Sequence, residues 1–165
     1  MLPIYERAEI AEEIVEQIKI AQRFEKNPLR HDFIAIKRIQ KQITQKAKEI
    51  GTYQKCIQCP EKCCTKGAEQ FLDETYFVYL FLHASPSVKF DVQRALRREH
   101  DELCRFVTPS GCMLPKIFMP APCKAFFCPE MGGLNGNRSY LTQQGQSLNM
   151  RFYELGRRLR VAELL

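Results

Sequence analysis

Four of the eight cysteines of this chain lie in one short block, Cys56-x2-Cys59-x3-Cys63-Cys64, in which Pro60 indicates irregular backbone. The other four follow at positions 104, 112, 123 and 128. Two cysteines separated by two residues can bind one metal through a short turn, and thiolates select zinc, copper(I) or iron–sulfur clusters. The spacing therefore predicts a cysteine-ligated metal or cluster protein.

Length and the first residues favour metal ligation over disulfides. A chain of 165 residues can bury its own core in a single domain, 1–165, without the disulfides that small secreted domains need. The start, MLPIYERAEIAEE, places acids where a secretory signal is basic and then apolar, and the longest apolar run, YFVYLFLH, is too short to span a membrane. We therefore expect a cytoplasmic protein with reduced thiols and no membrane partner, and four disulfides are the alternative.

The first fifty residues carry two apolar stripes with helical spacing, which predict a helical hairpin over 1–51. Asp32 is the expected N-cap of the second helix and Gly51 its stop. Because the stripes are long and rich in isoleucine, a homodimer through these helices is a further hypothesis. The stripes are Ile4, Ala8, Ala11, Val15 and Ile18, then Phe33, Ile36, Ile39, Ile43, Ala47 and Ile50.

The remainder predicts a mostly α fold with its cysteines placed largely in loops. An apolar helix is expected over 68–83, and a second from about Ser87 to Phe106 after a Ser85-Pro86 start. A C-terminal helix is expected over 138–165. Between them, five prolines and four glycines indicate loop or short strand, with one β-hairpin around Pro115 to Met119.

A tetrahedral zinc site and a cubane cluster each need four protein ligands, so eight cysteines allow one centre or two. We expect the metal-binding region over 52–130, with Cys56, Cys59 and Cys63 as the first ligands. One of Cys112, Cys123 and Cys128 would complete the set. Cys64 would join a second arrangement, because adjacent side chains diverge. Cys104 ranks last, because it falls in the helix predicted to reach Phe106, where a buried structural thiol is the simpler interpretation.

The segments CIQCPEKCCTKG and GCMLPKIFMPAPCKAFFC resemble the YkgJ-like family of zinc- or iron-chelating cysteine-cluster domains. That family has the same first block and a later Pro-Cys-Arg-x-Phe-x-Cys segment. Here Lys124 stands in place of the arginine, and Cys128 is displaced by one residue. The resemblance covers about residues 52 to 130 and implies metal chelation; related flagellin lysine methylases suggest an iron–sulfur cluster. With the Cys-Pro pairs at 59–60 and 128–129, this favours [4Fe–4S] slightly over zinc.

Neither a catalytic residue nor a cofactor site beyond the metal is predicted, and enzymatic activity stays open. His31, His83 and His100 are read as satisfied or solvated side chains, not as bases for a cysteine nucleophile. The net charge of +6 is spread over helix faces, which argues against nucleic acid as the main partner. The expected function is an iron–sulfur protein with a redox or accessory role. The alternative is a zinc-stabilised module that contacts a protein or nucleic acid.

Overall fold

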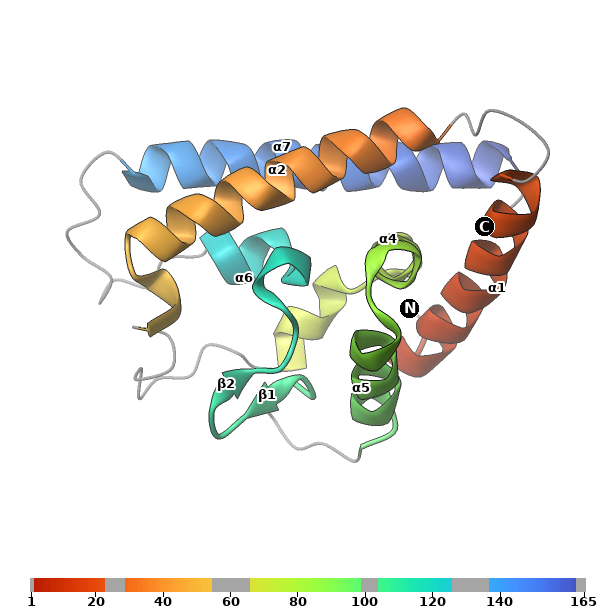
Figure 1. The fold of residues 1–165 in the computed structure, drawn as a ribbon, viewed down its shortest axis with the longest axis horizontal. Helices are drawn as coiled ribbons and strands as arrows, with labels where there is room; N and C mark the ends of the chain where they lie inside the picture. Colours follow the sequence, from red (N-terminus) through yellow and green to blue (C-terminus); the bar gives the residue numbers. More distant parts are fainter. Residues whose placement is uncertain (1, 23–28, 55–65, 99–103, 126–136, 163–165) are drawn as a thin grey trace.

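The computed structural model describes residues 2–22, 29–54, 66–98, 104–125 and 137–162, and in these ranges the chain is mostly α, as predicted (Figure 1). None of the described helices is both long enough and apolar enough to cross a membrane. The elements are α1 (Ile4–Gln22), α2 (Arg30–Glu49), η1 (Lys66–Phe71), α4 (Glu74–His83), α5 (Pro86–Leu96), β1 (Val107–Thr108), β2 (Gly111–Cys112), η2 (Lys116–Phe118), α6 (Ala121–Ala125) and α7 (Asn137–Val161).

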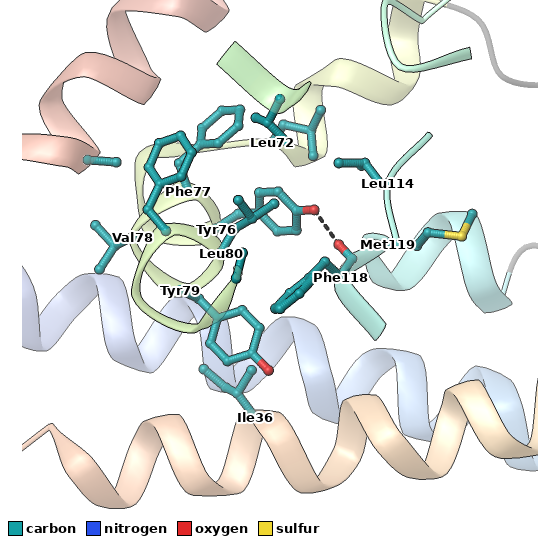
Figure 2. Packing of buried hydrophobic residues seen from close by; sticks show 14 of the residues in the cluster. Ile36, Leu72, Tyr76, Phe77, Val78, Tyr79, Leu80, Leu114, Phe118 and Met119 are labelled. Carbon is teal, nitrogen blue, oxygen red and sulfur yellow. Dashed lines mark hydrogen bonds between the residues drawn. The ribbon is translucent and has the colours of Figure 1, made fainter. Parts of the chain in front are cut away.

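The core is built around α4, whose residues from Thr75 to Phe81 are all buried. A helix that is apolar on every side has to be surrounded by other elements, and α4 contacts both α1 and α7. The aromatic side chains of Tyr76 and Tyr79 point from α4 toward Phe118 of η2, whereas Phe77 lies on the side of α4 away from Phe118 (Figure 2). The short helix α4 therefore supplies the framework on which the longer helices pack.

The two longest helices, α2 and α7, pack against each other along one side of the fold (Figure 1). They run antiparallel, because Arg158 near the end of α7 lies 3.3 Å from Asp32 in the first turn of α2. Gly156 lets α7 approach α4 closely: a Cβ at this position would lie 2.7 Å from Oγ1 of Thr75. Both predicted stripes are buried, which confirms the helical assignments.

The expected N-terminal hairpin is corrected in its packing. Both helices form, but α1 packs mainly on α4 whereas α2 packs on α7, so the two do not form a closely packed pair. The stripe of α2 is covered by α7, α6 and η2, so α1 packs instead on the apolar surface of α4. The stripes that suggested a homodimer are thus buried within one chain and give that hypothesis no support.

Three helix boundaries also differ from the prediction. Leu29, and not Asp32, is the N-cap of α2. The helix expected over 68–83 is divided into η1 and α4, because the carboxylate of Asp73 accepts a 2.8 Å hydrogen bond from the N–H of Tyr76 and caps α4 there. The helix that begins after Ser85 ends at Leu96 and does not reach Phe106. The Ser85 cap, the stop at Gly51 (φ 71°) and the C-terminal helix are confirmed, although 163–165 lie outside the described residues.

One β-hairpin is present, but it lies earlier than expected. Val107 pairs with Cys112, and Thr108 pairs with Gly111, in an antiparallel ladder of two residues per strand. Gly111 adopts φ 108°, which a glycine accommodates without strain. Oγ1 of Thr108 donates a 2.8 Å hydrogen bond to the carbonyl of Gly111. The residues around Pro115 to Met119 instead form the short helix η2.

Candidate metal centre

Three of the eight cysteines lie in the described part of the chain: Cys104, Cys112 and Cys123. Each is half-buried against the apolar core, and none forms a disulfide. The predicted ligands Cys56, Cys59, Cys63, Cys64 and Cys128 lie outside the described residues. The downstream half of the predicted site can therefore be examined directly, and the first block only through the residues that flank it.

The β-hairpin positions two of these cysteines. Cys112 is in β2 opposite Val107, and the carbonyl of Cys104 accepts a 2.9 Å hydrogen bond from the N–H of Val107. The fully buried Phe106 and the buried Leu114 anchor the hairpin in the core on either side. Cys104 lies outside the described helices, so the helix expected to contain it is wrong there, while its rank among the ligands stays a prediction. Its position beside the hairpin places it in the same region as Cys112.

Cys123 lies in α6, whose orientation is fixed by its neighbour Lys124. The Lys124 side chain is fully buried, and its ammonium donates hydrogen bonds to Oε1 of Gln40, to Oγ1 of Thr44 (3.1 Å) and to the carbonyl of Ile117 (3.0 Å). Thr44 in turn donates to the carbonyl of Lys116 at 3.3 Å. This network joins α6 and η2 to α2. Burial lowers the pKa of Lys124 to about 7, although the nearby Cys123 acts in the opposite direction.

The electrostatics of Tyr76 show that each of the three thiols lies near its hydroxyl. Its side chain is buried at the centre of the core, and its hydroxyl donates a hydrogen bond to the carbonyl of Phe118 (Figure 2). Burial raises the pKa of Tyr76 well above its usual value, and Cys112, Cys123 and Cys104 each raise it further. Two cysteines at the β-hairpin and one in α6 therefore lie near enough to one phenol to affect its pKa.

The described residues on either side of the first cysteine block contact the downstream segments. Before the block, the ring of Tyr53 lies under the ammonium of Lys116, 4.7 Å from the ring centroid. Tyr53 and Lys116 also line a hollow of about 440 Å³ together with Thr44, Lys48 and Gln54. After the block, η1 contacts α6, which carries Cys123. The residues on either side of the block are thus held close to the segments that carry Cys112 and Cys123.

The surroundings of Cys112 suit a sulfur ligand. Burial raises the pKa of its thiol, whereas the N–H of Leu114 and the charge of Lys116 lower it. Backbone amides that donate to sulfur stabilise the thiolate and tune metal–sulfur sites. A metal ion would have to displace the thiol proton, because only the thiolate is a ligand.

The described residues alone do not complete a site. Among them, no group of three or more His, Cys, Asp or Glu side chains is arranged to hold a metal ion. Three thiols beside the core, one with an amide donor, nevertheless fit part of a thiolate ligand set for zinc or an iron–sulfur cluster. His83 lies between the rings of Phe33 and Tyr79, at 5.5 and 5.0 Å between ring centroids, and so packs as a core side chain.

The sequence did not predict the supporting residues of this region, Tyr76 and Lys124. Tyr76 was assigned only to an apolar helix face. Lys124 was singled out only by its place in the second cysteine segment, and nothing in that segment indicates that its side chain is buried. Comparison of the chain with protein-family models, with curated proteins and with solved structures found no match.

Proposed function

We propose that this chain is a cysteine-ligated metal-binding protein that holds a [4Fe–4S] cluster, with a redox or accessory role. The observation that carries the proposal is that Cys104 and Cys112 at the hairpin and Cys123 in α6 all lie near one phenol. The first cysteine block adds four thiols between two flanks that contact these same segments. A chain with these thiols near one region of its core has the donors that a cluster requires.

The proposed ligands are Cys56, Cys59 and Cys63, completed by Cys112, Cys123 or Cys128. Cys64 and Cys104 supply further thiols, and the position of Cys104 beside the hairpin brings it back among the candidates. When bound, a cluster of this type supplies one-electron redox chemistry. The residues of this chain would hold it, exclude water through the apolar core and donate amide hydrogen bonds to its sulfurs.

A structural zinc site is the alternative, because the same thiolates bind zinc tetrahedrally. Metal analysis of protein purified without oxygen separates the two. The cluster predicts a brown protein that contains iron and acid-labile sulfide, whereas zinc predicts a colourless protein with zinc in fixed ratio to the chain. A protein that binds neither metal after anaerobic reconstitution would refute the proposal.

Ligand assignment is tested by Cys59→Ser, Cys112→Ser and Cys104→Ser. We expect Cys59→Ser to strip the metal, and Cys112→Ser to lower the metal content if the hairpin supplies a ligand. Val78→Ala is the matched control, because it removes buried apolar volume from α4 without removing a thiol. It should lower stability and leave the metal-to-protein ratio unchanged. Full metal content in Cys59→Ser would show that the ligand assignment is wrong.

A further inference from the structure

Charge is strongly segregated between the helices of this fold. The sequences of α2 and α7 together contain eleven basic and three acidic residues, a net charge of +8, whereas the whole chain carries only +6. In contrast, α1 contains five acidic and two basic residues. The basic and acidic surfaces thus belong to different, separately packed helices.

The outer face of α2 presents a regular row of exposed side chains. Steps of three and four residues place them on one side of the helix, and they are Arg30, Ile34, Lys37, Lys41, Gln45 and Lys48. Lys37 and Lys41 form no ion pair with any acid in the described ranges. Ile34 is 55% exposed in the same row.

The outer face of α1 presents a row of the opposite charge. Its members are Tyr5, Glu9, Glu13, Glu16 and Ile20, also at steps of three and four, and all are exposed. Tyr5 and Ile20 are 48% and 59% exposed at the two ends. Within the described residues, neither Glu9 nor Glu13 forms an ion pair. The side of α1 that carries the apolar stripe is already buried, so this row faces away from the core; Glu16 in it pairs with Lys19 of the same helix.

Without Arg30, the two rows are similar in length, and their order agrees except that Lys48 would lie opposite an apolar end of the α1 row. At a rise of 1.5 Å per residue, the row from Tyr5 to Ile20 is about 22 Å long and the row from Ile34 to Lys48 about 21 Å. When the rows are aligned in either direction, a glutamate lies opposite Lys37 and another opposite Lys41. An apolar end of the acidic row, Tyr5 or Ile20, then lies opposite Ile34. The match is therefore one of charge and of apolar position together.

We propose that the outer face of α2 binds the outer face of α1 from a second copy of this chain. The charges of the two rows are complementary, and the apolar ends would bury the exposed Ile34. Because each copy carries both rows, the contact can be reciprocal in a closed dimer or continue from copy to copy. This interface differs from a dimer through the apolar stripes, which are buried in the monomer, and it does not depend on the metal.

The test is sedimentation velocity on the full chain under reducing conditions, at about 0.1 M and about 1 M salt, where the Debye length falls from about 10 Å to about 3 Å. We expect association at low salt that is lost at high salt. Glu9→Lys/Glu13→Lys and Lys37→Glu/Lys41→Glu should each lose self-association. An equimolar mixture of the two should form a heterodimer, and a variant that carries all four changes should associate again. Lys89→Glu/Arg94→Glu on α5, a charge change of the same size elsewhere, should associate like the unaltered chain.

Other results would overturn the proposal. One is a chain that stays monomeric at low salt at every protein concentration. The other is self-association that persists both in Glu9→Lys/Glu13→Lys and in Lys37→Glu/Lys41→Glu. A monomer whose Lys37 and Lys41 instead retain polyglutamate or a single-stranded oligonucleotide would assign this face to an acidic protein or to nucleic acid. Circular dichroism of each variant confirms that helical content is retained, so that loss of association is not loss of folding.

Discussion

Replacement of Lys124 by methionine should change stability with a sign that depends on pH. The substitution keeps an unbranched side chain in the buried site but removes the donor to Gln40, Thr44 and Ile117. Acceptors left buried without a donor cost about 1–3 kcal/mol each. Thr44 is only half-buried and can keep other partners, so the loss is roughly 3 kcal/mol in total.

The opposing effect is the burial of the lysine charge. The pKa of Lys124 falls from 10.5 to about 7, which at 1.36 kcal/mol per unit costs the folded wild type about 5 kcal/mol below pH 7. Between pH 7 and 10.5 the unfolded chain binds more protons than the folded chain, so wild-type stability rises with pH in this window. The penalty equals the roughly 3 kcal/mol of lost hydrogen bonds near pH 8. Lys124→Met should therefore be the more stable protein below about pH 8 and the less stable one above it.

The assay is denaturant unfolding, followed by circular dichroism, on metal-free protein with chelator and reductant from about pH 6.5 to about pH 9.5. The cysteines and tyrosines titrate in both proteins, so the difference between the two curves isolates Lys124. Lys89→Met, on α5 and outside both the Lys124 network and the α2 row, is the control and should give a difference that does not reverse sign with pH. A wild type that is more stable at every pH would refute the reasoning, because the three hydrogen bonds would then outweigh burial throughout.

Two further substitutions test the packing. Burial, and to a lesser extent the charge of Lys37, lowers the pKa of His83. As pH falls below 6.5, the unfolded chain therefore binds a proton at His83 before the folded chain does, and wild-type stability should decrease. His83→Phe should remove this part of the decrease when unfolding curves are measured at several pH values. Gly156→Ala should destabilise the fold by about 1–3 kcal/mol, because the new Cβ would lie 2.7 Å from Oγ1 of Thr75, although alanine favours helix by about 1 kcal/mol. Adding Thr75→Ala should recover part of the loss in thermal unfolding, and equal losses with and without Thr75→Ala would show that the contact is not responsible.

The helices could be predicted wherever an apolar stripe and a stop signal agreed. The stripes of α1 and α2, the stop at Gly51 and the Ser85-Pro86 start all follow from local spacing and capping chemistry. The break at Asp73 could not be found from apolar spacing, because the residues on both sides continue the pattern and only the cap separates them. The hairpin was predicted around Pro115 to Met119, but its turn lies at the Pro-Ser-Gly sequence of 109–111.

The candidate site was predicted in residue type but not in its support. Spacing identified the cysteines, yet it gave no information about which core residue they surround. Lysine is expected at the surface, so no pattern predicts that Lys124 is fully buried and joins three elements. The low rank of Cys104 followed from a helix that was extended too far, which shows that a ligand ranking depends on element boundaries that sequence patterns define poorly.

The hairpin at 107–112 has a further consequence for how metal would enter and leave. A hairpin with two residues per strand is not stable in water by itself. Its order therefore comes from Phe106 and Leu114, which are buried in the hydrophobic core at its two ends. Cys104 and Cys112 therefore lie beside a hairpin whose position is set by buried apolar side chains. A metal bound as proposed would then be lost and regained without unfolding of the hairpin.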